Sequence, residues 1–241
     1  MVTPGRNRSF QQRLLTWYGV HGRDLPWRKI RDPYSILVSE ILSHQTQISR
    51  VVPVYEQLLN RYPTVEQMAA ARLSEIKAIT DPLGYKVRGK WLHGAALQVA
   101  DRLGGRFPRT PDGLRELPGV GRYTAGAVMN FAYHVDAPVL DTNVARVLRR
   151  HFGLGEMAGR ARPASLWQLA RAIIPTGKGY LINQALMDLG AMVCRARAPR
   201  CDACPLRRSC TYRRSVNRPT SPLPELRRLR APGSPRGRRA R

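Results

Sequence analysis

Residues 110–129 read TPDGLRELPGVGRYTAGAVM, two helical stretches around a short turn that contains Gly119 and Gly121. Glycines at these positions permit a positive φ and let another backbone approach closely. The second helix begins at Arg122, so its free N–H groups and the positive end of its dipole face outward. Such a turn is typical of a site that grips nucleic-acid phosphates without reading sequence. A turn that needs glycine only for its geometry explains the same pattern, and the pattern alone leaves both interpretations open.

The rest of the chain predicts helices in succession. Their expected ranges are 8–20, 33–49, 51–61, 64–78, 87–103, 111–117, 122–133, 141–152, 164–173 and 180–192. The breaks between them fall at Gly, Pro, Asn or Asp. Because no clean alternating apolar run with hairpin turns occurs, we expect an all-α fold without a substantial sheet.

Basic residues dominate the charge of the chain. Lys and Arg number 41 against 16 Asp and Glu, for a formal net charge of +25 over 241 residues. Residues 213–241 are rich in Pro, Ser and Gly, contribute +9 and are expected to form a disordered basic tail, which leaves +16 on the body. This excess favours nucleic acid as the partner over an acidic protein or a simple need for solubility.

The chain shows no targeting or membrane signal. No segment approaches about 18 uninterrupted apolar residues, and the N-terminus lacks the apolar core of a signal peptide. We therefore expect a soluble, monomeric, cytoplasmic and nucleoid-associated protein without a membrane partner.

All four cysteines lie within residues 194–210, in the pattern C-x6-C-x2-C-x5-C. Cys194, Cys201, Cys204 and Cys210 could supply four thiolates either to zinc or to an iron–sulfur cluster. The spacing predicts a four-thiolate metal site and leaves the metal open. Two disulfides are disfavoured because secretory signals are absent. Arginines between the cysteines would be presented to phosphates by a loop that ligation holds rigid.

Two carboxylates are candidates for catalysis. A helix over 33–49 would place Glu40 and His44 one turn apart on its apolar face. Burial raises the pKa of a carboxyl group, which suits a general acid, although an arginine partner for Glu40 is the competing interpretation. Asp141 suits a helix N-cap, with Asn143 close behind. A cleft that brings Asp141 opposite Glu40 would divide acid and stabiliser roles as in glycoside chemistry.

Residues 10–212 resemble the helix-hairpin-helix DNA glycosylases related to endonuclease III, and most closely their MutY-type branch. The resemblance is carried by LPWR (25–28), DPYSILVSEILSHQTQ (32–47), PLGYKVRGKWLH (82–93), LPGVGRYTAGAV (117–128), VLDTNVARVL (139–148), NQALMDLGAMVC (183–194) and the cysteine pattern, which is similar to the family's [4Fe–4S] loop. It implies two lobes: a six-helix barrel over 31–136, and a cluster domain of 1–30 with 137–212. It also implies a [4Fe–4S] cofactor held by the four cysteines.

The resemblance implies roles for individual residues. Glu40 matches the acid that protonates the departing base, Asp141 the aspartate that stabilises the sugar cation, and Asn143 a helper beside that sugar. Tyr123 stands where bifunctional relatives carry a lysine that forms a Schiff base and cleaves the strand. A tyrosine cannot form that imine, so the resemblance implies base excision with little or no abasic-site lyase activity.

The same comparison implies DNA contacts and a substrate. Gln45 and Tyr85 match residues that wedge into a duplex while the target nucleotide flips out, and His44 is expected on the pocket face where the base is selected. With the hairpin Gly119–Arg122, they would bind double-stranded DNA that holds a mismatch or lesion. The leading expectation is a monofunctional glycosylase that removes adenine opposite 8-oxoguanine or guanine.

Two alternatives remain open. Ser43-His44-Gln45-Thr46 stands where the MutY-type motif usually reads LQQT, and PWRKIRDPYSILVSEIL also resembles thymine–guanine mismatch glycosylases. Excision of thymine or uracil opposite guanine is therefore the first alternative, and a catalytically silent DNA-binding module is the second. The printed sequence ends before the C-terminal domain with which MutY-type enzymes recognise 8-oxoguanine.

Overall fold

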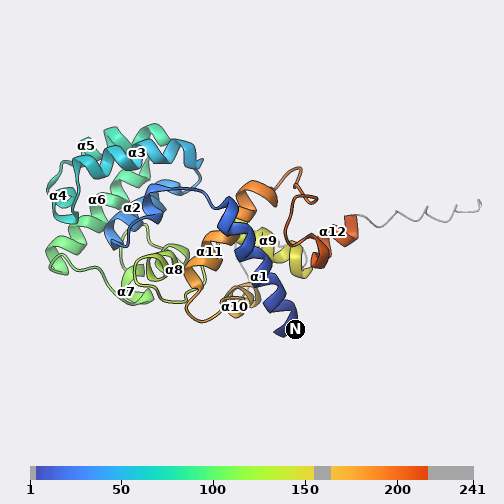
Figure 1. Ribbon diagram of the computed structural model, residues 1–241. Coiled ribbons are helices and arrows are strands. Elements are labelled where there is room, and N and C mark those ends of the chain that lie inside the picture. Colours follow the sequence, from blue (N-terminus) through green and yellow to red (C-terminus); the bar gives the residue numbers. More distant parts are fainter. Residues whose placement is uncertain (1–3, 155–163, 217–241) are drawn as a thin grey trace, which may run out of the picture.

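The computed structural model describes residues 4–154 and 164–216. Within these ranges every regular element is helical and no strand occurs, so the all-α expectation is confirmed (Figure 1). The α-helices are α1 Pro4–His21, α2 Pro33–Ser43, α3 Ile48–Arg61, α4 Val65–Ala70, α5 Leu73–Thr80, α6 Val87–Leu97, α7 Pro111–Arg115, α8 Arg122–Phe131, α9 Thr142–Phe152, α10 Ala164–Ala172, α11 Gly179–Asp188 and α12 Thr211–Val216.

Short helices of other types connect or extend them. The 3₁₀ helices are η1 Pro26–Arg28, η2 Asp81–Leu83 and η5 Arg207–Ser209. The π-helical turns η3 Gln98–Arg102 and η4 Leu189–Val193 continue α6 and α11. The expected helices over 87–103 and 180–192 therefore span these extensions.

The expected helix over 33–49 is wrong beyond Ser43. Asp32 caps α2 by accepting a hydrogen bond from the Ser35 N–H at 2.8 Å, as the Asp-Pro start predicts. The helix ends at Ser43, Gln45 adopts a φ of 54°, and α3 starts only at Ile48. Ile48 lies two helical turns after Ile41 and so fits one continuous apolar face, but the five polar residues 43–47 between them mark the break.

Two further expectations need correction. The helix expected over 64–78 is divided into α4 and α5, because Ala71 is extended between them. The basic tail was expected from residue 213, but α12 continues through Val216. The remainder of that tail lies outside the described residues. None of the described helices is long and apolar enough to span a membrane.

The helices enclose two hydrophobic cores. The first contains Ile41, Leu58, Met68 and Val128 and is built from α2 to α8. The second is built around α1, α9, α10 and α11, where Phe10, Leu14, Leu148 and Leu186 are its buried side chains. In Figure 1, α1 therefore lies with the C-terminal helices rather than with α2. The domain boundaries at 30/31 and 136/137 stay a prediction.

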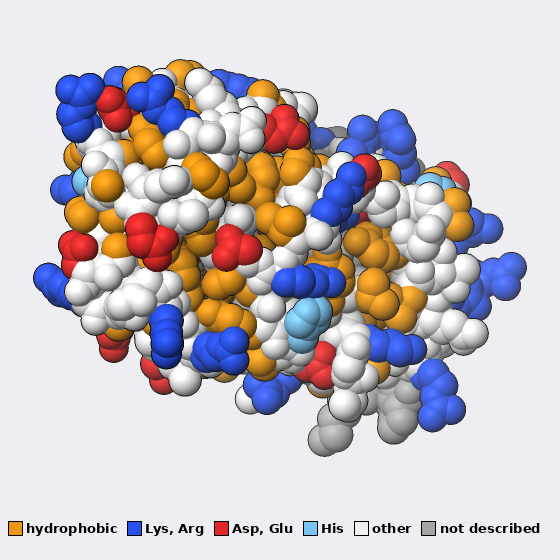
Figure 2. Space-filling view, turned by 60° about the vertical axis from the view of Figure 1, so that its left-hand side comes forward, with side chains coloured by type: hydrophobic (Ala, Val, Ile, Leu, Met, Phe, Trp, Pro, Cys, Tyr) orange, Lys and Arg blue, Asp and Glu red, His pale blue; other side chains and the backbone are white. Residues whose placement is uncertain are grey.

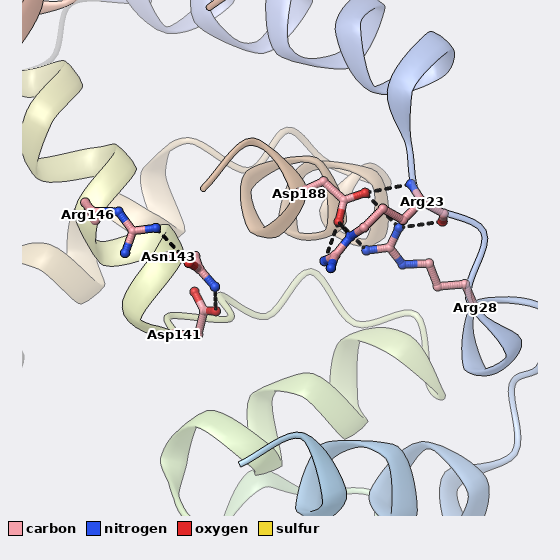
Figure 3. Close-up of polar contacts among 6 residues, drawn as sticks. All are labelled: Arg23, Arg28, Asp141, Asn143, Arg146 and Asp188. Atoms are coloured by element: carbon pink, nitrogen blue, oxygen red, sulfur yellow. Dashed lines mark hydrogen bonds and ion pairs between the residues drawn. The ribbon is translucent and has the colours of Figure 1, made fainter. Parts of the chain in front are cut away.

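A buried ion pair joins the N-terminal segment to α11. The side chain of Asp188 has no exposed surface, and its two oxygens accept hydrogen bonds from the Arg23 N–H and from both guanidinium groups of Arg23 and Arg28 at 2.7–2.9 Å (Figure 3). Although burial opposes ionisation, the hydrogen bonds and charge of Arg28, followed by those of Arg23, hold the pKa of Asp188 below its ordinary value.

Replacing Asp188 should destabilise the fold strongly. Asp188→Asn leaves two arginines without their shared anion, so we expect the free energy of unfolding to fall by about 3–5 kcal/mol. Since the folded pKa is depressed, this stabilisation is present above the unfolded carboxyl pKa of about 3.9 and is lost as the pH falls through the folded value. Urea unfolding at several pH values measures both effects.

Asp24→Asn is the matched control, because the Asp24–Lys29 pair is exposed and should contribute less than about 1 kcal/mol. Equal losses in the two variants would contradict the structural role of Asp188.

Candidate active site

A cavity of about 710 Å³ lies where the two cores meet. Its wall includes side chains from η1, α2, α8, α9 and α11 and from the turn between α2 and α3. The predicted site residues that line it are Glu40, His44, Gln45, Tyr85, Tyr123, Asp141 and Asn143. The structure thus brings all the predicted catalytic residues to one cavity, together with part of the predicted DNA-binding set.

Glu40 is a buried carboxyl on the cavity wall. Only 5% of the residue is exposed, and its Oε2 atom has no hydrogen-bond partner among the described residues. Burial raises the pKa of Glu40 to about 7, a hydrogen bond with Tyr123 and the charge of Arg28 oppose the rise, and the negative charge of Asp141 adds to it. A carboxyl group with this pKa can hold and release a proton at neutral pH.

Asp141 serves as an N-cap and as a cavity residue at once. Its Oδ1 accepts the Val144 N–H at 2.6 Å, which caps α9, and its Oδ2 accepts the Asn143 side-chain amide at 2.9 Å (Figure 3). Both oxygens are therefore held in a fixed orientation. The capping interpretation and the catalytic interpretation of this residue are compatible.

A chain of contacts leads from the cavity to the cysteine segment. Arg146 donates from Nη2 to Asn143 Oδ1 and to the Gly190 carbonyl, both at 2.7 Å. Its Nε donates to the Cys194 carbonyl at 2.7 Å. Asn143 is thus fixed on one side by Asp141 and on the other by an arginine that also holds the first cysteine.

His44 follows α2 directly and lies beside an aromatic wall. Its ring centroid is 6.1 Å from that of Trp91, edge to face, and its Nε2 is 3.5 Å from Thr124 Oγ1. Burial and the nearby Arg88 lower the pKa of His44. The neutral imidazole is therefore favoured at the cavity wall at neutral pH.

Sequence reasoning missed several cavity residues. Arg23, Trp27, Arg28, Trp91 and Gln184 line the cavity but were not singled out. Gln184 offered the clearest signal, since it places a polar side chain within a largely apolar stretch, whereas Arg28 lies among other charged residues. Trp91 offered none, because an aromatic residue in a helix usually belongs to the core.

The glycine hairpin lies outside the cavity wall but packs against it. Gly119 has a φ of 78°, and a Cβ atom there would come within 2.8 Å of Trp91. Gly119 uses the positive φ that glycine permits, whereas Gly121 is extended at φ −93°. No side chain caps α8, and the Arg122 guanidinium lies 4.1 Å from the centroid of the Trp167 ring. The start of α8 thus keeps the character of an anion site.

The four cysteines line a second, small cavity of about 30 Å³. Burial, with added repulsion from Cys194, Cys210 and Cys201, raises the pKa of Cys204 to about 11 although a backbone hydrogen bond opposes it. Arg150 lies beside them, with its Nη1 3.6 Å from Cys194 Sγ. In the described ranges no three His, Cys, Asp or Glu side chains lie close enough to hold a single metal ion.

One face of the molecule carries both basic and hydrophobic side chains. Figure 2 shows Lys and Arg side chains spread over this face, at its edge and between the hydrophobic side chains of its centre.

Comparison with known proteins identifies relatives along most of the chain. Residues 38–172 match the family described as HhH-GPD superfamily base excision DNA repair protein. Adenine DNA glycosylase of Rattus norvegicus is 39% identical over 223 residues, which are 86% of this chain and 42% of the rat protein. Thymine-DNA glycosylase of Aeropyrum pernix is 40% identical over 215 residues, which are 86% of this chain and 96% of that protein. The chain thus spans less than half the length of its mammalian relatives.

Solved structures agree with these matches. A thermostable thymine-DNA glycosylase superposes with a TM-score of 0.83 at 34% identity and covers 89% of this chain and 100% of its own. A trapped endonuclease III–DNA covalent intermediate gives a TM-score of 0.78 at 26% identity, with 90% of this chain and 100% of its own covered.

Removing the Glu40 carboxyl should stabilise the protein above neutral pH. Because the folded pKa of about 7 exceeds the unfolded value of about 4.3, the carboxyl favours folding below the lower value, and this advantage is lost as the pH rises through 7. The free energy of unfolding of Glu40→Gln, relative to that of wild type, should therefore rise by about 2 kcal/mol when the pH is raised from 5 to 8. Denaturant unfolding at both pH values measures the gain.

Glu75→Gln is the control, since hydrogen bonding with Arg72 lowers the pKa of the half-buried Glu75 instead. A gain of the same size in this variant, or none in Glu40→Gln, would contradict a neutral buried acid.

Proposed function

The chain belongs to the HhH-GPD superfamily of base excision DNA repair proteins, and from this premise we propose that it is a DNA glycosylase that acts on double-stranded DNA. The observation that carries the proposal is the pair of carboxylates on one cavity, with the pKa of Glu40 raised to about 7 and Asp141 fixed by two donors. This is the division of acid and stabiliser that cleavage of a glycosidic bond requires.

Each group has a defined part in the reaction. The bond between sugar C1′ and the base breaks, its electrons pass to the base, and the Glu40 proton goes to a base nitrogen. The Asp141 carboxylate stabilises the positive charge that develops on the sugar, and Asn143 holds that carboxylate. Water then adds hydroxyl to C1′ and returns its proton to Glu40.

We propose adenine opposite 8-oxoguanine or guanine as the target. A purine leaves poorly as an anion and gains most from a proton donor such as Glu40. The adenine DNA glycosylases of Rattus norvegicus and Mus musculus are 39% and 38% identical to the chain. His44, as a neutral imidazole, would meet the flipped base beside Trp91.

Thymine or uracil opposite guanine is the second candidate. The observation that favours it is similarity to proteins of that name, since the A. pernix thymine-DNA glycosylase is 40% identical to the chain and a thermostable thymine-DNA glycosylase superposes with a TM-score of 0.83. A catalytically silent DNA-binding module is disfavoured because Glu40 and Asp141 share the cavity.

We propose a [4Fe–4S] cluster for Cys194, Cys201, Cys204 and Cys210. All four line one cavity, and four thiolates are the ligand set that an iron–sulfur cluster requires. The cluster would supply iron–thiolate bonds that cross-link residues 194–210. Arg146 and Arg150 hold the same segment through its carbonyls, so the segment and the Asp141 side of the cavity are coupled.

A panel of duplexes tests the target base. Single-turnover excision should be fast on A:8-oxoguanine and A:G and slow on T:G and U:G. Because Tyr123 offers no amine, borohydride should trap little covalent DNA adduct. Excision of T:G without A:8-oxoguanine would move the proposal to the second candidate, and efficient trapping would overturn monofunctional chemistry.

The raised pKa of Glu40 predicts how excision depends on pH. With a pKa of about 7, Glu40 loses its proton as the pH rises through that value, so the excision rate should fall on the alkaline side. Glu40→Gln should lose excision by at least about 100-fold and keep lesion binding. A variant that retains excision would show that the acid is misassigned.

Iron and acid-labile sulfide analysis tests the cluster. We expect about four of each per chain in protein purified without oxygen, and a large loss of both in Cys204→Ser. Zinc in their place would reject the cluster. DNA binding should weaken with the loss of iron, because the arginines of residues 194–210 are then no longer held.

A further inference from the structure

Arg88 of α6 is a buried cation that the proposed chemistry does not use. The residue has no exposed surface, and it is absent from the cavity wall. Its Nη2 contacts the His44 carbonyl and Thr46 Oγ1. Its Nε and Nη1 are buried without a hydrogen-bond partner among the described residues. Unsatisfied buried donors cost free energy, so a fold that keeps them calls for an explanation.

Both partners of Arg88 belong to the turn of residues 44–47, which lines the cavity between α2 and α3. The backbone hydrogen bonds within the turn are local, from the His44 N–H to Ile41 and from the Thr46 N–H to Ser43. Gln45 is exposed at φ 54°, a conformation that costs a non-glycine residue about 1 kcal/mol or more and persists only when its surroundings hold it. Arg88, which follows the turn by 42–44 residues in the sequence, stabilises this conformation through its contacts with His44 and Thr46.

Arg88 also contacts a second element at the cavity rim. Its guanidinium carbon lies 5.5 Å from the centroid of the Tyr85 ring, close enough for a cation–π interaction. Tyr85 is 40% exposed, lines the cavity and rests edge-on against Trp91 at 5.6 Å. A single guanidinium therefore contacts the residues on either side of the exposed Gln45 and the ring of the exposed Tyr85.

We propose that Arg88 is a positioning residue that sets Gln45 and Tyr85 relative to each other, so that both enter the duplex as a nucleotide turns into the cavity. The inference rests on the proposed function. Extruding a nucleotide costs a few kcal/mol of unstacking. Contacts from Gln45 and Tyr85 offset this cost more fully when both groups are already fixed, because they then lose little conformational entropy on binding DNA. Arg88 thus acts on duplex opening and leaves the chemical step to Glu40 and Asp141.

If Arg88 acts as a positioning residue, its replacement should reduce activity without lowering the stability of the fold. Methionine fills a similar volume without a buried charge, so Arg88→Met should keep the thermal midpoint of unfolding within a few degrees of wild type or raise it. A residue that served only the fold would instead lower the midpoint and every activity together. Arg61→Met is the control, because Arg61 is 56% exposed and pairs with Glu75 away from the cavity.

The experiment compares a paired target base with the same base opposite a gap, where little duplex opening is needed. Arg88→Met should slow single-turnover excision of the paired base by about 10- to 100-fold and that of the unpaired base by less than about threefold. Arg88→Lys, which keeps the charge but not the fork, should recover part of the loss. Arg61→Met should match wild type on both substrates.

A second readout does not require excision. In a Glu40→Gln background, 2-aminopurine beside the target brightens when the duplex opens, and Arg88→Met should reduce that signal at saturating protein. If wild type excises no duplex of the panel, the proposed function fails while this signal still tests Arg88. Equal loss on paired and unpaired targets, or an unchanged signal, would overturn the proposal.

Thr46→Val keeps the proposal testable if Arg88→Met does not fold. It removes the side-chain acceptor of Arg88 on the turn, together with the hydrogen bond that Thr46 Oγ1 donates to the His44 carbonyl at 3.2 Å, and leaves the contact between Arg88 and that carbonyl. It should produce the same selective loss on the paired base to a smaller degree. Combined with Arg88→Met, it should add little further loss, because both changes break one interaction. Additive losses, or no selective effect, would show that Arg88 does not act through the turn.

Discussion

The ion pair at Asp188 is the constraint on which the cavity depends. It ties the segment of Arg23 and Arg28 to the end of α11, so residues far apart in the chain form one wall. Arg28 also faces Glu40 and opposes the rise in its pKa. The same interaction therefore closes the fold around the cavity and sets part of its electrostatics. A buried carboxylate shared by two arginines tolerates little change, since loss of one partner leaves a charge unpaired.

The cavity and the residues that support its rim include groups that a fold built for stability alone would avoid. Among the described residues, one oxygen of the buried Glu40 carboxyl and two nitrogens of the buried Arg88 guanidinium have no hydrogen-bond partner. Gln45 holds a positive φ. Costs of this kind collect where chemistry or binding requires them. Their concentration at one cavity supports a catalytic interpretation more strongly than any of the residues does alone.

The two proposed catalytic carboxylates lie in contrasting surroundings. Glu40 is buried, and burial raises its pKa although a hydrogen bond with Tyr123 opposes the rise, whereas Asp141 caps α9 and accepts two hydrogen bonds. Two carboxylates in contrasting environments can act as acid and anion in the same cavity. The cysteine segment belongs to the Asp141 side, where Arg146 connects it to Asn143. A change in that segment would therefore affect Asp141, the proposed stabiliser, more directly than Glu40, the proposed acid.

Composition and periodicity alone determined the all-α class, most helix positions, the glycine hairpin and the grouping of the cysteines, because each depends on residues close in sequence. They also marked Glu40 and Asp141 as candidates. The tertiary structure decided that these two face one cavity, that α2 stops at Ser43, and that Trp91, Gln184 and Arg88 belong to the site or its support. These features arise from contacts between distant segments, and the period of a helix carries no record of a partner outside it.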